Sequence, residues 1–168
     1  DHVAALAGIL TDNGVPSVVH VLTDGRDTPP KSAVDSLVRL EAALPPSVPV
    51  ATVIGRYYAM DRDKRWDRVT RAYNAIVEAE APRFPDARSA IADAYAHDLT
   101  DEFVEPAALA GRPRIDPARD TAIFVNFRPD RARQLAVRLV SAGVDLTTMT
   151  RYASDLDVPV ALPEQVLN

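Results

Sequence analysis

The chain has 168 residues, of which 47% are apolar and 26% charged, a balance typical of one globular domain. Its net charge of −5 argues against a general nucleic-acid binder. No apolar run approaches the roughly 20 residues that would span a bilayer. The absence of cysteine excludes disulfides and thiolate metal sites and fits an intracellular protein. The chain opens without Met and without the basic start of a signal peptide, so we expect a fragment of an intracellular protein.

The first half of the chain alternates helical and β-strand patterns. Apolar residues at helical spacing end at Gly14, and β-branched runs such as "SVVHVLT" are typical of buried strands. Turn residues in "DGRDTPP" and "PPSVP" separate these segments. The pattern predicts, in chain order, a helix, a strand, a helix and a strand, at residues 2–14, 17–23, 31–44 and 48–55.

The second half continues the alternation. We expect Trp66 and Tyr73 to lie in the core on one stripe of a long helix, and Asp86 to cap the helix that follows. The pattern predicts helices at 61–80, 86–97 and 130–143, strands at 121–127 and 146–153, a loop with short extended pieces at 101–120, and an irregular tail.

This order of elements favours an α/β fold. Strands that alternate with helices are typical of a mostly parallel sheet with helices on both faces, that is, three layers. The sequence shows no internal repeat and no domain boundary, so we expect residues 1–168 to form a single domain, with a loop-rich excursion near 101–120.

Arginines follow each of the three clearest strands. In open parallel sheets, ligands bind beyond the carboxyl ends of the strands, so these arginines would converge if the strands are parallel neighbours. The guanidinium group is a planar fork of donors that suits phosphate and carboxylate. The motifs are "TDGRD" with Arg26 and Asp27, "GRYYAMDRD" with Arg56, Asp61 and Arg62, and "NFRPDR" with Arg128, Asp130 and Arg131.

The interpretation from pattern alone is a site for a small, hydroxylated polyanion such as a phosphorylated carboxylic acid or a sugar phosphate. Asp27, Asp61 and Asp130 would then orient the arginines or bind hydroxyl groups of the ligand. The alternative is structural: aspartates cap helices, and salt bridges account for the arginines. His20 lies within a strand and is expected to be a core residue with its hydrogen bonds satisfied. No nucleophile elbow, phosphate loop or metal-ligand spacing is present.

Four long motifs in order, "LTDGRDTPPKSA", "GRYYAMDRDKRWDRV", "TDEFVEP" and "NFRPDRARQL", closely resemble the cofactor-independent phosphoglycerate mutases. The resemblance covers nearly the whole chain. It implies a two-domain enzyme in which a phosphatase-like domain carries a serine nucleophile and two metal ions, usually manganese. An inserted phosphotransferase domain holds the glycerate. This chain resembles the inserted domain alone, so no metal is expected in it.

The resemblance assigns substrate contacts to Arg26, Asp27, Arg56, Arg62, Arg128 and Arg131. It implies that serine takes the phosphoryl group from 3-phosphoglycerate and returns it to the 2-hydroxyl of the retained glycerate. In that relay the arginines would grip the carboxylate and the phosphoryl oxygens. Asp27 is the candidate catalytic acid and base toward the glycerate hydroxyls, and the plainer alternative is that it only orients Arg26 or a hydroxyl group.

Three readings of the chain's function follow. The first is the substrate-holding part of a cytoplasmic, glycolytic mutase, inactive without its phosphatase-like domain in cis and with no nucleic-acid or membrane partner. The second is a freestanding module that binds phosphoglycerate-like anions, and the third is a structural α/β domain with salt-bridged strand ends. Arg133 matches no assigned contact and is expected to face solvent or a carboxylate.

Overall fold

The computed structural model describes residues 2–78, 80–112 and 114–162. The strands are β1 (Val19–Thr23), β2 (Val50–Gly55), β3 (Arg83–Phe84), β4 (Ala107–Leu109), β5 (Thr121–Phe124) and β6 (Asp145–Thr148). The α-helices are α1 (His2–Asp12), α2 (Ala33–Ala43), α3 (Arg56–Ala59), α4 (Trp66–Tyr73), α5 (Ala87–Ala96) and α6 (Pro129–Ser141). A π-helical stretch, η1 (Asn74–Glu78), extends α4, and a short 3-10 turn, η2 (Asp101–Phe103), precedes β4.

Two sheets make up the β structure. The larger has the strand order β1-β2-β4-β3, in which β1 and β2 are parallel and β4 runs antiparallel to β2. Strands β5 and β6 form a separate parallel pair, so β5 is not hydrogen-bonded to β1 or β2 within the described chain. Three of the four strand pairings are parallel, which confirms the mostly parallel α/β fold.

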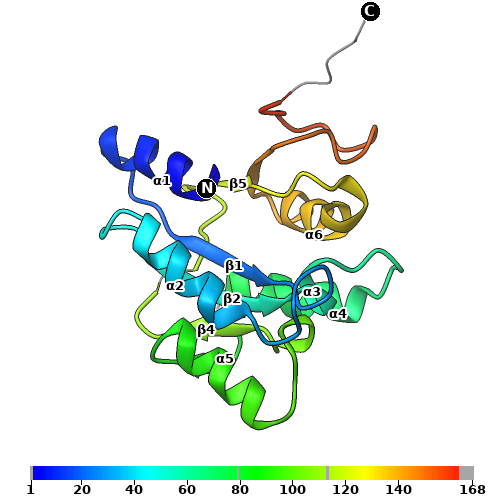
Figure 1. The fold of residues 1–168 in the computed structure, drawn as a ribbon. Coiled ribbons are helices and arrows are strands. Elements are labelled where there is room, and N and C mark those ends of the chain that lie inside the picture. Colours follow the sequence, from blue (N-terminus) through cyan, green and yellow to red (C-terminus); the bar gives the residue numbers. More distant parts are fainter. Residues whose placement is uncertain (1, 79, 113, 163–168) are drawn as a thin grey trace, which may run out of the picture.

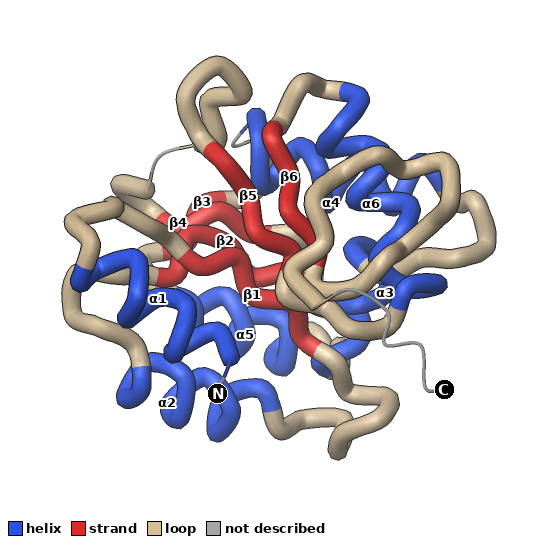
Figure 2. Tube along the Cα trace, turned by 90° about the horizontal axis from the view of Figure 1, so that it is seen from above, coloured by secondary structure: helices blue, strands red, loops and turns tan. Residues whose placement is uncertain are grey.

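Strand β2 is the centre of the fold, and all six of its residues are buried. Because successive side chains point to opposite faces, Val53 packs toward α2 and α5 whereas Ile54 packs toward α4 and α6. The views show α5 and α6 on opposite sides of the strands (Figure 1) and α1 and α2 on the same side as α5 (Figure 2). The helices therefore cover both faces of the sheet, as the three-layer prediction requires.

The helix predicted at 61–80 begins later than expected. Asp61 Oδ2 accepts the N–H groups of Asp63 and Arg65 at 3.0 and 2.9 Å, so the chain turns before α4 starts at Trp66. Trp66 lies in the first turn and is 46% exposed, so its predicted place in the core is wrong, while Tyr73 is buried as expected.

The segment 101–120 was predicted as a loop with short extended pieces, and one of those pieces is structurally central. Residues Ala107–Leu109 form β4, which is fully buried between β2 and β3. The run "AAL" lacks β-branched residues and therefore gives a weak strand signal. Because β4 is antiparallel to β2, the residues before it lie at the carboxyl ends of β1 and β2, beside the predicted arginine motifs.

Candidate functional site

The loop after β1 presents Arg26 and Asp27 through a turn built by Asp24. The Asp24 carboxylate accepts the backbone N–H groups of Arg26 and Asp27, both at 3.1 Å. Gly25 adopts a φ of 69°, which a residue with a side chain rarely adopts. This arrangement leaves Arg26 and Asp27 exposed at the tip of the strand.

Arg56 directly follows β2 and is only 4% exposed. Its Nη1 donates to Asp24 Oδ1 at 2.5 Å and to Asp27 Oδ2 at 2.8 Å. Burial alone would raise the pKa of Asp24, but the hydrogen bonds from Arg56 and the backbone amides outweigh it and hold that pKa below its usual value. Burial likewise opposes the charge of Arg56, and the two carboxylates outweigh it, so the Arg56 pKa is raised.

A second cluster joins the loop after β2 to the start of α6. Arg128 Nε donates to Asp130 Oδ1 at 2.8 Å, and Arg62 Nη1 donates to Asp130 Oδ2 at 3.2 Å. The hydrogen bond from Arg128, followed by that from Arg62, holds the Asp130 pKa below its ordinary value although burial opposes it. Two arginines therefore share one carboxylate at the surface.

Arg131 has a different environment from the other arginines. It is half-buried, and its Nη1 donates to the Met60 carbonyl at 3.4 Å. Its Nε is buried without a hydrogen-bond partner, and none of the ion pairs within 4.0 Å found in the described residues includes it. Burial lowers the pKa of Arg131, and so does repulsion from Arg62, Arg56, Arg128 and Arg26. A half-buried guanidinium crowded by like charges is an unsatisfied binding group for an anion.

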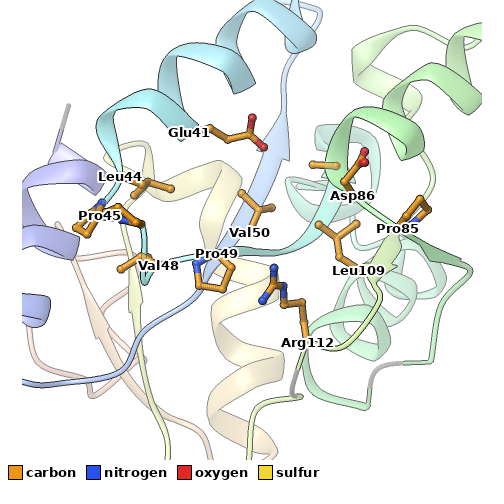
Figure 3. Close-up of a pocket in the computed structure, with 12 residues that line it drawn as sticks. Glu41, Leu44, Pro45, Val48, Pro49, Val50, Pro85, Asp86, Leu109 and Arg112 are labelled. Atoms are coloured by element: carbon orange, nitrogen blue, oxygen red, sulfur yellow. The ribbon is translucent and has the colours of Figure 1, made fainter.

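A polar recess of about 60 Å³ lies between the loops that carry these arginines. Its lining residues are Arg26, Arg56, Tyr57, Met60, Asp61, Asp63, Arg68, Glu102 and Arg131. A larger cavity of about 270 Å³ lies at the opposite end of β2, near Val50, and has one arginine, Arg112, among its residues (Figure 3). The arginine-rich recess is therefore the candidate site although it is the smaller of the two.

The structure brings the predicted site residues together in two groups. Arg26, Arg56 and Arg131 line the recess, whereas Arg62 and Arg128 are joined through Asp130 beside it. Asp27 is not among the lining residues and is 66% exposed in its side chain. In this structure it is hydrogen-bonded to Arg56 and not to Arg26, which was the partner considered for it from the sequence.

Sequence reasoning assigned no role to three residues, two of which line the recess and one of which holds its arginines in place. Asp24 holds the first loop and Arg56. Glu102 lies 3.7 Å from Arg26. Arg68 stacks on Tyr57 at 3.8 Å from the ring centroid. Asp24 and Glu102 fall within the quoted motifs "TDGRD" and "TDEFVEP", so the signal was present but no role was assigned.

Neither a cluster of metal-ligating side chains nor a membrane-spanning helix is found in the described part of the chain. Residues 2–78, 80–112 and 114–162 contain no group of three or more histidine or carboxylate side chains placed to hold a metal ion. No described helix is long and apolar enough to cross a bilayer.

The fold and the site define the chain as an α/β domain that gathers arginines at the ends of its strands. Residues 1–158 match the family model described as "BPG-independent PGAM N-terminus (iPGM_N)". The chain belongs to this family.

Relatives agree with this assignment over nearly the whole chain. The 2,3-bisphosphoglycerate-independent phosphoglycerate mutase of Rhodopseudomonas palustris is 54% identical over 94% of this chain and 33% of its own length. The enzyme of the same name from Natronomonas pharaonis is 45% identical over 96% of this chain and 35% of its own. The solved structure of Leishmania mexicana phosphoglycerate mutase, determined at low cobalt concentration, superposes with a TM-score of 0.87, is 26% identical and is covered over 34% of its chain. The chain therefore spans about a third of the length of its relatives.

Proposed function

We propose that this chain is the substrate-holding part of a phosphoglycerate mutase, an isomerase of glycolysis and gluconeogenesis that interconverts 3-phosphoglycerate and 2-phosphoglycerate. The observation that carries the proposal is Arg131, a half-buried guanidinium with a lowered pKa and an unpartnered Nε at the strand ends. An anionic ligand in the recess would relieve the repulsion among the arginines. Membership of the mutase family makes phosphoglycerate the ligand of choice.

In this proposal the arginines divide the substrate between them. Arg26, Arg56 and Arg131 face the recess, and Arg62 and Arg128 contribute from its border after exchanging Asp130 for the ligand. Charge-assisted hydrogen bonds of this kind grip the carboxylate and the phosphoryl oxygens while charge shifts between them. Asp27 is the candidate acid and base toward the glycerate hydroxyls, because its exposed carboxylate reaches solvent while Arg56 fixes one of its oxygens.

The remaining chemistry belongs to the rest of the polypeptide. We propose that residues 1–168 form one inserted domain and that a phosphatase-like domain in cis supplies the serine that carries the phosphoryl group. By the resemblance, that other domain would also hold the two metal ions, usually manganese. The parent enzyme would be cytoplasmic, and the isolated chain would be inactive.

A chimera tests the proposal directly. Residues 1–158 replace the corresponding segment of the Rhodopseudomonas palustris mutase, and conversion of 3-phosphoglycerate is measured with manganese present. We expect an active enzyme in which Arg131→Ala lowers kcat/KM by about 100-fold or more, since it removes a charged donor from the transition state. The matched control is Arg133→Ala, which removes a surface arginine paired with Asp155 at 2.9 Å, outside the recess.

Two outcomes would count against this function. If Arg131→Ala and Arg133→Ala leave the same activity, the recess does not hold the substrate. Calorimetry on the isolated chain separates the alternatives further: we expect weak binding of 3-phosphoglycerate and no turnover, whereas tight binding would support a freestanding anion-binding module.

A further inference from the structure

Asp101 is a buried carboxylate without a cationic partner. Its residue is 1% exposed, and none of the ion pairs in the described residues includes it. Its Oδ2 accepts the backbone N–H groups of Ser32 and Ala33 at 2.8 and 2.9 Å, and its Oδ1 accepts the hydroxyl of Tyr95 at 2.5 Å. The buried charge is therefore stabilised by the N-terminus of α2 and by one phenol.

The main chain of Asp101 holds the ends of the loop that carries Arg26 and Asp27. The Thr23 hydroxyl donates to the Asp101 carbonyl at 2.7 Å, at the end of β1. The Asp101 N–H donates to the Pro30 carbonyl at 2.8 Å, at the other end of the loop. Together with the carboxylate contacts, these bonds attach residues 23–33 to a segment about seventy positions away in the chain.

Two glycines let this segment approach closely. A Cβ on Gly25 would lie 2.7 Å from the Asp101 Cβ and 2.7 Å from the Glu102 amide nitrogen. A Cβ on Gly55, the residue before Arg56, would lie 2.5 Å from the Glu102 carbonyl oxygen. The segment "DEF" is thus wedged between the two loops that present the arginines.

The residue next to Asp101 contacts the candidate site itself. Glu102 lines the recess, and its carboxylate lies 3.7 Å from Arg26 Nη1. A shift of Asp101 would therefore move both Arg26 and its carboxylate partner. Catalytic constellations lose much of their rate when supporting residues allow displacements of about 1 Å.

We propose that Asp101 is a positioning residue of the arginine site, which it orders by fixing the loop of Arg26 and Asp27 against α2 and α5. This inference rests on the proposed function, because the readout is the mutase reaction. It also assigns a role to the motif "TDEFVEP", for which the substrate contacts leave none.

The competing interpretation is that Asp101 only caps α2. Ser32 occupies the N-cap position of α2, but its side chain donates to the Pro29 carbonyl and makes no cap bond, so Asp101 serves as the cap from a distance. A second aspartate caps a helix away from the arginine recess: the exposed Asp86 accepts the Ser89 N–H at 2.8 Å at the start of α5, near the larger cavity. Asp86 therefore controls for the loss of a helix cap.

The experiment uses the chimera and compares Asp101→Asn, Tyr95→Phe and Asp86→Ala. We expect Asp101→Asn to lower kcat/KM for 3-phosphoglycerate about 10- to 100-fold, and Tyr95→Phe to lower it less, because the two backbone N–H bonds to the Asp101 carboxylate remain. Asp86→Ala, which removes a helix cap, should lose thermal stability without losing activity. Tyr95→Phe keeps the carboxylate, so it provides the measurement if Asp101→Asn fails to fold.

A double-mutant comparison separates positioning from general stability. If Asp101 acts through the Arg26 loop, Asp101→Asn should have little further effect on kcat/KM in an Arg26→Ala background. Full additivity of the two changes, or equal losses of activity in Asp86→Ala and Asp101→Asn, would overturn the inference. The proposed function is tested separately. It stands if the unmodified chimera is active and Arg131→Ala lowers its activity, whatever the outcome for Asp101. An inactive chimera, or an Arg131→Ala variant with full activity, would count against the function itself.

Discussion

Adding a methyl group at Gly25 should destabilise the fold through two separable effects. The φ of 69° disfavours any residue with a Cβ by about 1–2 kcal/mol. The new Cβ would also lie 2.7 Å from Asp101 and from the Glu102 backbone, and relieving such overpacking costs about 1–3 kcal/mol. We therefore expect Gly25→Ala to lower the free energy of unfolding by about 2–5 kcal/mol.

Two other glycines isolate the two effects. Gly14 has a similar φ of 70°, but a Cβ there would meet no atom within 4 Å, so Gly14→Ala should show only the backbone cost of about 1–2 kcal/mol. Gly55 has an ordinary φ of −67°, but a Cβ would lie 2.5–2.8 Å from three backbone atoms, so Gly55→Ala should show only the steric cost.

Urea denaturation of the chain, followed by circular dichroism, measures these differences from the shift of the midpoint at constant slope. Gly8 provides a baseline, since it lies within α1 with open space around it, and Gly8→Ala should stabilise the chain by up to about 1 kcal/mol. If Gly25→Ala and Gly14→Ala destabilise the chain equally, the close approach of Asp101 to the loop is wrong.

Other predictions concern pH and charge. Burial lowers the pKa of His20 to about 4, so between pH 7 and pH 5 the unfolded state binds a proton at His20 and the folded state does not. The free energy of unfolding should therefore fall by about 2 kcal/mol over this range. The variant His20→Gln should remove this pH dependence. Arg131→Gln removes the repulsion between Arg131 and its neighbouring arginines, so the free energy of unfolding should stay unchanged or rise by up to about 1 kcal/mol. The same variant should weaken phosphoglycerate binding, because it also removes a cation from the recess. Arg133→Gln breaks an exposed pair with Asp155, so it should lower the free energy of unfolding by about 0–1 kcal/mol and leave phosphoglycerate binding intact. If Arg131→Gln lowers the free energy of unfolding more than Arg133→Gln does, these two predictions are wrong.

The strand-end arginines could be predicted from sequence because two local signals agree. Apolar runs mark β1 and β2, and the parallel pairing of these strands places Arg26 and Arg56 at one edge. The third motif converges for a different reason, since β5 pairs with β6, and α6 carries Arg131 to Met60. Three of the five predicted arginines therefore line one recess, although the described strands form two sheets and not the single sheet that was expected to bring them together.

What sequence reasoning missed depends on contacts between distant segments. Asp101 lies 69 positions from Ser32, and no local sequence pattern predicts that it caps the N-terminus of α2. Strand β4 is short and built of small residues, so its central place follows from its neighbours and not from its own propensity. Trp66 kept the helical spacing of core residues, but Asp61 delays the helix and leaves it at the exposed first turn.

The pairing of the arginines indicates how the site would take up a ligand. The buried Arg56 is held by two carboxylates at 2.5 and 2.8 Å, and removing both would leave its charge buried without a partner. The pairs Arg26–Glu102 and Arg62–Asp130 are longer, at 3.7 and 3.2 Å, and each has an arginine about half exposed, so they contribute little and exchange easily. Under the proposed function, an incoming phosphoglycerate would meet one fixed cation in Arg56, one unsatisfied cation in Arg131, and outer arginines that can change partners. Such an arrangement suits the proposed reaction, in which the phosphoryl group moves between two oxygens of the glycerate. The outer arginines can follow the phosphoryl group, while Arg56 and Arg131 keep the glycerate in place.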